Sequence, residues 1–327
     1  MMNGVSPPRA CLWCGTFLTA PLFMGVKDRL GFVPGQWDFL QCTACGSANL
    51  SPMPSLQQIA SYYPRNYGFS MESDSRLGRF ARKAEEFFFY RFSYGSQARK
   101  VLRAVGGDGR GKRLLDIGCG NGWLLRRLQQ YGFDLHGVDF QPDTVEYVKT
   151  RLRIPTICTD ASNVSGAYPA NSFDVITTFH LLEHLPDVGQ MLRTCIHLLR
   201  PGGFLIAAMP LIDSMQARIF GRHWHAVTEA PRHLSIPTQR AAIRACAEAG
   251  FQDVSIRPDA LLACTGVAAL SLLPRTSSGH LPSMSPLASA SLRGLAGVLT
   301  YALLPWCAME GYVLGRPAAG IVCARKG

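Results

Sequence analysis

Three glycines alternate with other residues directly after a short apolar run. The pattern is Asp116-x-Gly118-x-Gly120-x-Gly122. Glycine lets a backbone turn tightly and approach a bound ligand where a Cβ would block it. The dinucleotide fingerprint G-x-G-x-x-G has its third glycine one position later. The loop therefore indicates a nucleotide-like ligand without saying which one.

Two acidic residues end later apolar runs and could complete the same site. An aspartate in the position of Asp139 can accept hydrogen bonds from both hydroxyls of a ribose. The neighbouring ring of Phe140 can cover an adenine face. Asp160 could accept a hydrogen bond from the adenine amino group.

Histidines supply the candidate proton acceptors. His180, Glu183 and His184 are spaced i, i+3, i+4, so they share one side if that segment is helical. A hydroxyl nucleophile gains from such a base. The spacing also occurs in a zinc hydrolase motif, and His184 could instead be a structural histidine bonded to a backbone carbonyl.

A second cluster, residues 222–225 and 231–234, holds three histidines, two arginines and a tryptophan. We expect this segment to overhang the reacting group, with His233 as the preferred base. The alternative is a turn whose histidines lie on the surface.

Four cysteines form two CxxCG knuckles, Cys11 with Cys14 and Cys42 with Cys45. Four sulfurs suit a tetrahedral zinc ion, and four protein ligands leave no open position for catalysis. We therefore predict a structural zinc ribbon that supplies folding energy to a small module. A redox pair is the alternative, but the expected preceding βα unit is missing.

The elements that would position these residues alternate between apolar strands and amphipathic helices. Strands are expected at 112–117, 133–139, 156–158, 173–179 and 204–209, with two more at 254–256 and 320–324. Helices are expected at 121–131, 142–151, 187–199 and 237–249. This alternation predicts an α/β fold: a Rossmann-like, doubly wound, mostly parallel seven-stranded sheet that binds ligands at the carboxyl ends of its strands.

Five runs in order make the pattern specific: LLDIGCGNGWLL, GVDFQP, TDA, FDVITTFHLLEHLPD and LLRPGG. Together they resemble the class I S-adenosylmethionine-dependent methyltransferases. The resemblance implies that Asp116 and Gly118–Gly120, Cys119 included, contact the amino acid part of the cofactor. It places Asp139 at the ribose and Asp160 with Ala161 at the adenine, and we expect Phe140 and Phe179 beside the cofactor. The early third glycine and the Leu-Arg-Pro-Gly-Gly turn disfavour NAD.

The resemblance also bears on the histidines and on the N-terminal region. It implies that the segment with residues 222–225 and 231–234 lines the acceptor pocket. Family members often carry Glu-His at positions 183–184, and some quinone-biosynthesis relatives hold a divalent metal there through acidic residues. In this chain His180 stands where one such acid would be, which puts that metal in doubt. The runs Pro52-Met53-Pro54 and Tyr62-Tyr63-Pro64 resemble bacterial methyltransferases with a zinc ribbon, often from sugar, polysaccharide or secondary-metabolite pathways.

Charge and hydropathy divide the rest of the chain. The net charge is +11, and residues 76–113 contribute most of it with eleven basic and three acidic side chains. Residues 260–315 carry only Arg275, Arg293 and Glu310 as charges. Their two apolar stretches, 260–274 and 294–309, are shorter than the roughly 20 residues a spanning helix needs. We expect either peripheral membrane contact, shared with a basic helix at 76–103, or a lid or a dimer contact.

These observations predict three regions: a zinc-ribbon module at 1–55, a helical linker and cover at 56–112, and a methyltransferase domain at 113–327 with an apolar helical insertion at 258–318.

The expected function is methyl transfer from S-adenosylmethionine to an oxygen of a small-molecule or saccharide acceptor, which could be lipid-linked. An RNA methyltransferase is the alternative, disfavoured by the zero net charge of residues 1–75; a non-catalytic S-adenosylmethionine-binding module is the other. Eleven cysteines indicate a reducing compartment, and the N-terminus has no apolar leader, so we expect a cytoplasmic protein. Peripheral contact with the inner membrane is compatible with that expectation. The oligomeric state is left open.

Overall fold

The computed structural model describes residues 10–63, 91–273 and 286–327 of the 327-residue chain. The arginines and phenylalanines expected to form a basic amphipathic helix between positions 76 and 88 lie outside the described residues. Every statement below concerns the described ranges.

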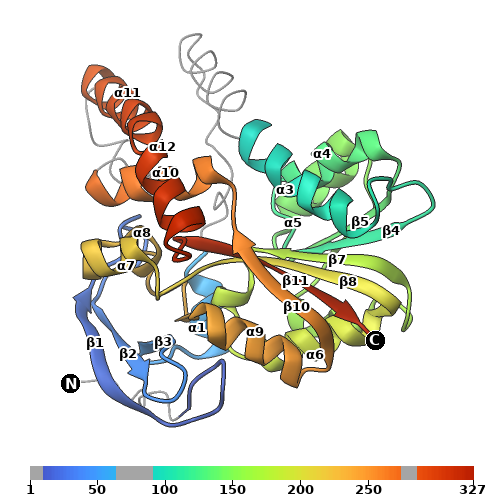
Figure 1. The fold of residues 1–327 in the computed structure, drawn as a ribbon, viewed down its shortest axis with the longest axis horizontal. Helices are drawn as coiled ribbons and strands as arrows, with labels where there is room; N and C mark the ends of the chain where they lie inside the picture. Colours follow the sequence, from blue (N-terminus) through green and yellow to red (C-terminus); the bar gives the residue numbers. More distant parts are fainter. Residues whose placement is uncertain (1–9, 64–90, 274–285) are drawn as a thin grey trace.

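A seven-stranded sheet forms the centre of the molecule (Figure 1). Its strands are β4 (Arg113–Ile117), β5 (Asp134–Asp139), β6 (Thr156–Cys158), β7 (Phe173–Phe179), β8 (Leu199–Pro210), β10 (Phe251–Pro258) and β11 (Ala319–Lys326). The order is β10-β11-β8-β7-β4-β5-β6, and β4 to β8 pair in parallel. Only β11 runs antiparallel to its neighbours, β8 and β10. The expected mostly parallel, doubly wound sheet is confirmed.

Helices cover both faces of this sheet (Figure 1). One face carries α3 (Arg91–Ala104), α4 (Trp123–Leu128) with η2 (Gln129–Tyr131), and α5 (Pro142–Tyr147) with η3 (Val148–Leu152); the other carries η4 (Ala161–Gly166), η5 (Leu182–His184), α6 (Val188–Leu198) and α9 (Gln239–Glu248). Leu124, Leu125 and Leu128 are buried on the first side, and Leu192 and Leu198 on the second. The regularly spaced apolar residues that predicted these helices therefore pack into two separate cores, one on each face of the sheet.

The N-terminal strands form a second, antiparallel sheet. It contains β1 (Leu18–Val26), β2 (Trp37–Cys42), β3 (Ala48–Ser51) and, from the other half of the chain, β9 (Ser235–Ile236). Its core includes Phe39, Leu50 and Trp224, all fully buried. The module expected at 1–55 thus completes its sheet and its core with residues from 212–236. The domain boundaries themselves stay a prediction.

Short helices connect the two sheets and extend beyond them. Helix α1 (Leu56–Ser61) follows β3, and its N-terminus is a capping box in which the side chains of Ser55 and Gln58 each bond to the other's backbone amide. Between β8 and β9 lie α7 (Met215–Phe220), η6 (Gly221–His223) and α8 (His225–Thr228).

The expected apolar insertion before the last strand consists of α10 (Leu261–Leu272), α11 (Pro286–Ala302), α12 (Leu304–Ala308) and η9 (Met309–Val313). In Figure 1, α11 projects away from both sheets at the upper left. Among the described helices, none combines the length and hydropathy needed to cross a membrane.

Candidate active site

A cavity of about 720 Å³ opens at the carboxyl ends of β4, β5 and β7. Its walls come from four places: the glycine loop, the ends of β5 and β6, the segment after β7, and helix α1. The residues used below are Leu56, Ile59, Ala60, Tyr63, Gly118, Gly120, Asp139, Phe140, Asp160, Ala161, His180 and His184. This is the edge at which parallel α/β sheets bind ligands.

The glycine loop is fixed to the neighbouring strand by its backbone. The amides of Gly118 and Cys119 both donate to the carbonyl of Val138, at 2.8 and 3.0 Å. Gly118 has φ +75°, and a Cβ there would stand 3.1 Å from Leu181. A side chain would therefore be strained and would narrow the entrance to the cavity.

Asp139 closes the loop from the opposite side. Its Oδ2 accepts from the amide of Gly120 at 2.9 Å, and its Oδ1 accepts from the amide of Gln141 at 3.0 Å. Burial raises the pKa of this carboxyl, and the amide hydrogen bonds oppose the rise. Each carboxylate oxygen has two acceptor sites. The side chain therefore keeps capacity for ribose hydroxyls while it fixes the loop.

Phe140, Asp160 and Ala161 line the cavity beyond Asp139. The ring of Phe140 is 45% exposed, which suits a flat apolar partner. Asp160 caps η4 by accepting from the amide and hydroxyl of Ser162 at 2.8 and 2.7 Å, both on Oδ1. The structure thus brings together the residues expected at the ribose and adenine.

Three residues expected at the cofactor do not line the cavity: Asp116, Cys119 and Phe179. Asp116 lies beneath the loop and accepts from the Thr177 hydroxyl at 2.6 Å. Burial raises its pKa to about 7, with Thr177 opposing the shift. Cys119 is buried, and its Sγ would lie 3.0 Å from a Cβ at Gly137. These side chains support the loop from within the core, because the loop presents its backbone to the cavity.

His180 stands at the end of β7 with φ +54° and is clamped between two fully buried carboxylates. Its Nδ1 is 3.3 Å from Glu183 Oε1, and its Nε2 is 3.6 Å from Asp259 Oδ2. Burial opposes a charge on this ring, but the two carboxylates prevail and raise the pKa of His180 to about 10. An imidazolium has no free lone pair. The two carboxylates therefore favour the protonated ring over a proton acceptor, and a catalytic role for His180 stays a prediction.

His184 has the opposite character. Its Nδ1 lies 3.1 Å from the carbonyl oxygen of Arg232 and 2.8 Å from the hydroxyl of Tyr63. Burial, followed by repulsion between the protonated forms of His184 and His233, lowers the pKa of His184 to about 3, so the ring is neutral. A carbonyl oxygen can only accept, so Nδ1 carries the proton and Nε2 the lone pair. His184 is thus the neutral histidine in the cavity wall.

His233, the expected base, lies behind His184 and not in the cavity wall. The two rings pack edge to face with centroids 4.6 Å apart. Nδ1 of His233 donates to the carbonyl of Ala226 at 2.7 Å, and burial lowers its pKa to about 3. One donor atom from each of Glu183, His184 and His233 lies within 4.8 Å of the others, so these three residues could hold a metal ion.

The segment 222–234 does not overhang the cavity as expected; none of its residues lines the wall. Trp224 and Arg232 are fully buried. The guanidinium of Arg232 donates two hydrogen bonds to Asp28, at 2.6 and 3.1 Å, and also meets Glu229. A buried arginine needs carboxylate partners, and Asp28 follows strand β1. Arg232 therefore attaches this segment to the N-terminal module and does not face the acceptor.

Helix α1 supplies a wall that the sequence analysis missed. Leu56, Ile59, Ala60 and Tyr63 follow the spacing i, i+3, i+4, i+7, and all four face the cavity. The ring of Tyr63 also meets the ring of Phe140 edge to face, with centroids 5.2 Å apart. That spacing, together with the capping box at Ser55, could have predicted a helix with one side facing a ligand.

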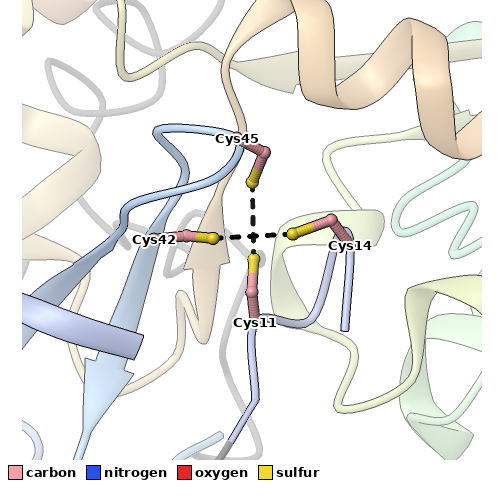
Figure 2. Close-up of side chains that lie close together, drawn as sticks. All are labelled: Cys11, Cys14, Cys42 and Cys45. Atoms are coloured by element: carbon pink, nitrogen blue, oxygen red, sulfur yellow. Dashed lines mark hydrogen bonds between the residues drawn. The ribbon is translucent and has the colours of Figure 1, made fainter. Parts of the chain in front are cut away.

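The four knuckle cysteines converge on one point. Figure 2 shows their Sγ atoms directed toward a common centre from two loops. The distances are 3.6 Å from Cys11 to Cys45 and 3.5 Å from Cys14 to Cys42, and all four sulfurs lie within 4.8 Å of one another. At these separations no pair forms a disulfide.

Glycine turns and hydrogen-bond donors to the sulfurs complete the cysteine cluster. Gly15 and Gly46 donate to the carbonyls of Cys11 and Cys42, and both have φ above +70°. The amide of Trp13 and the side chain of Asn49 donate to Cys11 Sγ, each at 3.5 Å. Donors of this kind stabilise thiolates around a metal. The residues present therefore fit a tetrahedral metal ion.

A family profile for a methyltransferase domain matches residues 87–256, which is about half of the chain. The chain belongs to this methyltransferase family. With the glycine loop, Asp139 and the adenine-side residues in place, it is an S-adenosylmethionine-dependent methyltransferase.

Curated relatives match the core of the domain. The chain is 37% identical over 101 residues to the ubiquinone biosynthesis O-methyltransferase of Coxiella burnetii, covering 29% of this chain and 42% of the relative. It is 35% identical over 101 residues to the enzyme of the same name from Sinorhizobium medicae, covering 30% and 41%. The chain spans about two fifths of the length of these relatives.

A solved structure extends the similarity to most of the fold. Haemonchus contortus phosphoethanolamine N-methyltransferase 2, in complex with phosphomonomethylethanolamine and S-adenosylhomocysteine, superposes with a TM-score of 0.53 at 18% identity. The match covers 95% of this chain and 69% of that one. At this identity the likeness establishes the fold alone.

Proposed function

We propose that this enzyme methylates a hydroxyl oxygen of a small-molecule or saccharide acceptor. The observation that carries the proposal is the neutral His184 in the wall of the cavity that also contains the glycine loop and Asp139. A hydroxyl is a weak nucleophile, and a neighbouring ring nitrogen with a free lone pair can take its proton. The name of the two curated relatives, O-methyltransferase, supports oxygen as the accepting atom.

S-adenosylmethionine, when bound, supplies a methyl group that is already activated. The protein's contribution is alignment of the acceptor with that methyl. The carbonyl of Arg232 and the hydroxyl of Tyr63 fix the His184 ring so that Nε2 carries the lone pair. The depressed pKa makes His184 a weak base, which suffices if proton removal accompanies methyl transfer and does not precede it.

The composition of the cavity wall favours a compact organic acceptor. No lysine or arginine is found among the described residues that line it. An RNA acceptor would bring phosphates that require cationic partners. Apolar side chains from α1 and from the segment after β7 suit a compact organic molecule better.

The test is a cell extract incubated with the enzyme and S-adenosylmethionine labelled on the methyl group. The proposal expects the label in small molecules, on an oxygen by fragmentation in mass spectrometry. The same extract treated with the Asp139→Ala variant is the control and should remain unlabelled. Label recovered in the RNA fraction, or on nitrogen, would contradict the proposal.

We also propose that the four cysteines hold one structural zinc ion. Zinc–sulfur bonds of about 2.3 Å place tetrahedral sulfurs about 3.8 Å apart, close to the 3.5 and 3.6 Å found between the two pairs. Elemental analysis of purified protein should find about one zinc per chain, reduced in Cys42→Ser. Zinc retained in full by that variant would place the ion elsewhere.

A further inference from the structure

Exposed apolar side chains concentrate on the helical insertion. Of the fourteen large hydrophobic residues that are exposed in the described ranges, eight lie between positions 272 and 314. These are Leu272, Leu295, Val298, Tyr301, Met309, Tyr312, Val313 and Leu314, and we call them the apolar insertion surface. Exposed apolar side chains that lie together on one surface mark an interaction site.

Most of these side chains lie on α11 and at the end of η9. Leu295, Val298 and Tyr301 recur every third residue, so they lie along one side of α11. Tyr312, Val313 and Leu314 follow one another at the end of η9. Helix α11 projects away from both sheets (Figure 1) and packs against α10.

Acidic groups are missing from the exposed part of the insertion. Glu310 is the one acidic residue between 261 and 314, and it is buried. Its carboxylate accepts from the amide and the side chain of Gln216, at 2.8 and 3.1 Å. No exposed negative charge therefore lies on the described part of the insertion.

The rim of the insertion is basic. Helix α3 contains no acidic residue and exposes Arg99 and Arg103. It is tied to the start of the insertion, because Gln97 donates to Asp259 at 3.1 Å and Lys100 donates to the carbonyl of Pro258. Arg257 and Arg316, at the two ends of the insertion, are exposed as well.

We propose that the apolar insertion surface docks on the interface of an anionic lipid bilayer. The apolar side chains would enter the boundary between headgroups and acyl chains, and the arginines of the rim would meet anionic headgroups. A second copy of the chain is a poorer occupant, since a symmetric contact would bring the same basic rims together.

The placement of the insertion connects this surface to the active site. Asp259, at the start of the insertion, contacts His180, which lines the cavity. Docking would therefore hold the cavity wall close to the bilayer. A lipid-linked acceptor is the consequence if the proposed O-methyl transfer is correct, whereas docking itself does not depend on the acceptor.

The experiment is sedimentation of the full-length protein with vesicles. Phosphatidylcholine vesicles containing phosphatidylglycerol should bind it, vesicles of phosphatidylcholine alone should bind it less, and added salt should weaken the difference. Leu295→Glu combined with Val298→Glu should lower binding at least tenfold. Phe17→Glu, at an exposed apolar position on the N-terminal module, is the matched control and should bind as the unmodified chain does.

Two further variants keep the outcome decisive. Arg99→Gln with Arg103→Gln should weaken binding to anionic vesicles by roughly thirtyfold, at about fivefold per cation. If the double glutamate variant does not fold, Val313→Glu, at a position 77% exposed, replaces it. Equal sedimentation of all variants would overturn the proposal. So would a dimer lost in the glutamate variants without any vesicle binding by the unmodified chain, which would assign the surface to a second copy. Affinity for S-adenosylmethionine, measured in parallel, should not change.

Discussion

The two walls of the cavity are built in different ways. The cofactor wall is formed by the ends of β4, β5 and β6, so it comes from one continuous stretch, residues 117–163. The acceptor wall combines α1, the segment after β7 and, beneath them, residues 222–236 and Asp259. Tyr63 and His184, which share a hydrogen bond, are 121 positions apart. A local motif fixes the first wall, and tertiary packing assembles the second.

Because the two walls are built separately, we expect substitutions to affect either cofactor binding or methyl transfer. Substitutions in the cofactor wall should change the affinity for S-adenosylmethionine, because the loop and Asp139 hold each other by local hydrogen bonds. Substitutions in the acceptor wall should change turnover with little effect on that affinity. The predictions that follow challenge this separation.

The largest expected effect belongs to His184→Ala. Losing a general base typically costs between 10² and 10⁴ in rate, so kcat should fall by roughly that factor. The affinity for S-adenosylmethionine should stay within about threefold, an allowance well below the tenfold that corresponds to 1.4 kcal/mol. His223→Ala, at an exposed position, is the control. Full turnover by the His184 variant would remove this residue from the mechanism.

Removal of the metal should damage the acceptor wall selectively. Helix α1 follows directly after the cysteine module, so chelation or Cys42→Ser should loosen the wall that it forms. We expect kcat/KM for the acceptor to fall about tenfold or more, alongside a lower melting temperature. The affinity for S-adenosylmethionine should fall less. An equal fall in kcat/KM for the acceptor and in the affinity for S-adenosylmethionine would show that α1 supports both walls of the cavity.

Stability should depend on pH through the buried histidines. The pKa of His233 is lowered to about 3 in the folded chain, against about 6.5 when unfolded. The unfolded chain therefore binds more protons below pH 6.5, and the free energy of unfolding should fall as the pH drops from 6.5 toward 3. The slope from His233 is at most about 1.4 kcal/mol per pH unit.

The variant His233→Gln isolates this contribution. Denaturant unfolding at several pH values should show a shallower slope below pH 6.5 for the variant than for the unmodified chain. Comparing the two cancels the other titrating groups, including Asp116, whose raised pKa acts in the opposite direction. Parallel slopes for the two proteins would mean that His233 is not buried in its neutral form.

The smallest expected effect is that of Tyr63→Phe. It removes one hydroxyl from Nδ1 of His184 while the carbonyl of Arg232 still fixes the tautomer. We expect a fall in kcat of about two- to tenfold, in line with one hydrogen bond of about 0.5–1.5 kcal/mol. A larger loss, comparable to that of His184→Ala, would mean that Tyr63 itself takes part in proton transfer.

The sequence predicted the cofactor wall because each residue there follows its strand directly. The strand ends at Ile117, Asp139 and Cys158 could be placed from hydropathy alone, and parallel pairing then brings them to one edge. The same reasoning misplaced Asp116 and Cys119, because a motif gives the path of the backbone and not the side chains that point into the core.

The acceptor wall could not be predicted in the same way. His180 and Asp259, Arg232 and Asp28, and β3 and β9 are pairs separated by long stretches of chain. Hydropathy gives no partner for a buried charge, so the segment that holds Arg232 and His233 was expected at the acceptor pocket. Their roles follow from the N-terminal sheet, which extends across residues 235–236 and encloses them.

The central claim, that the two walls divide binding from transfer, is tested most directly by calorimetric titration of S-adenosylmethionine into three proteins. The unmodified chain and His184→Ala should bind with similar affinity. Asp139→Ala should lose at least about a hundredfold, since the contacts to the amides of Gly120 and Gln141 and the proposed ribose contacts disappear together. Unchanged affinity in Asp139→Ala, or a matching loss in His184→Ala, would contradict the account.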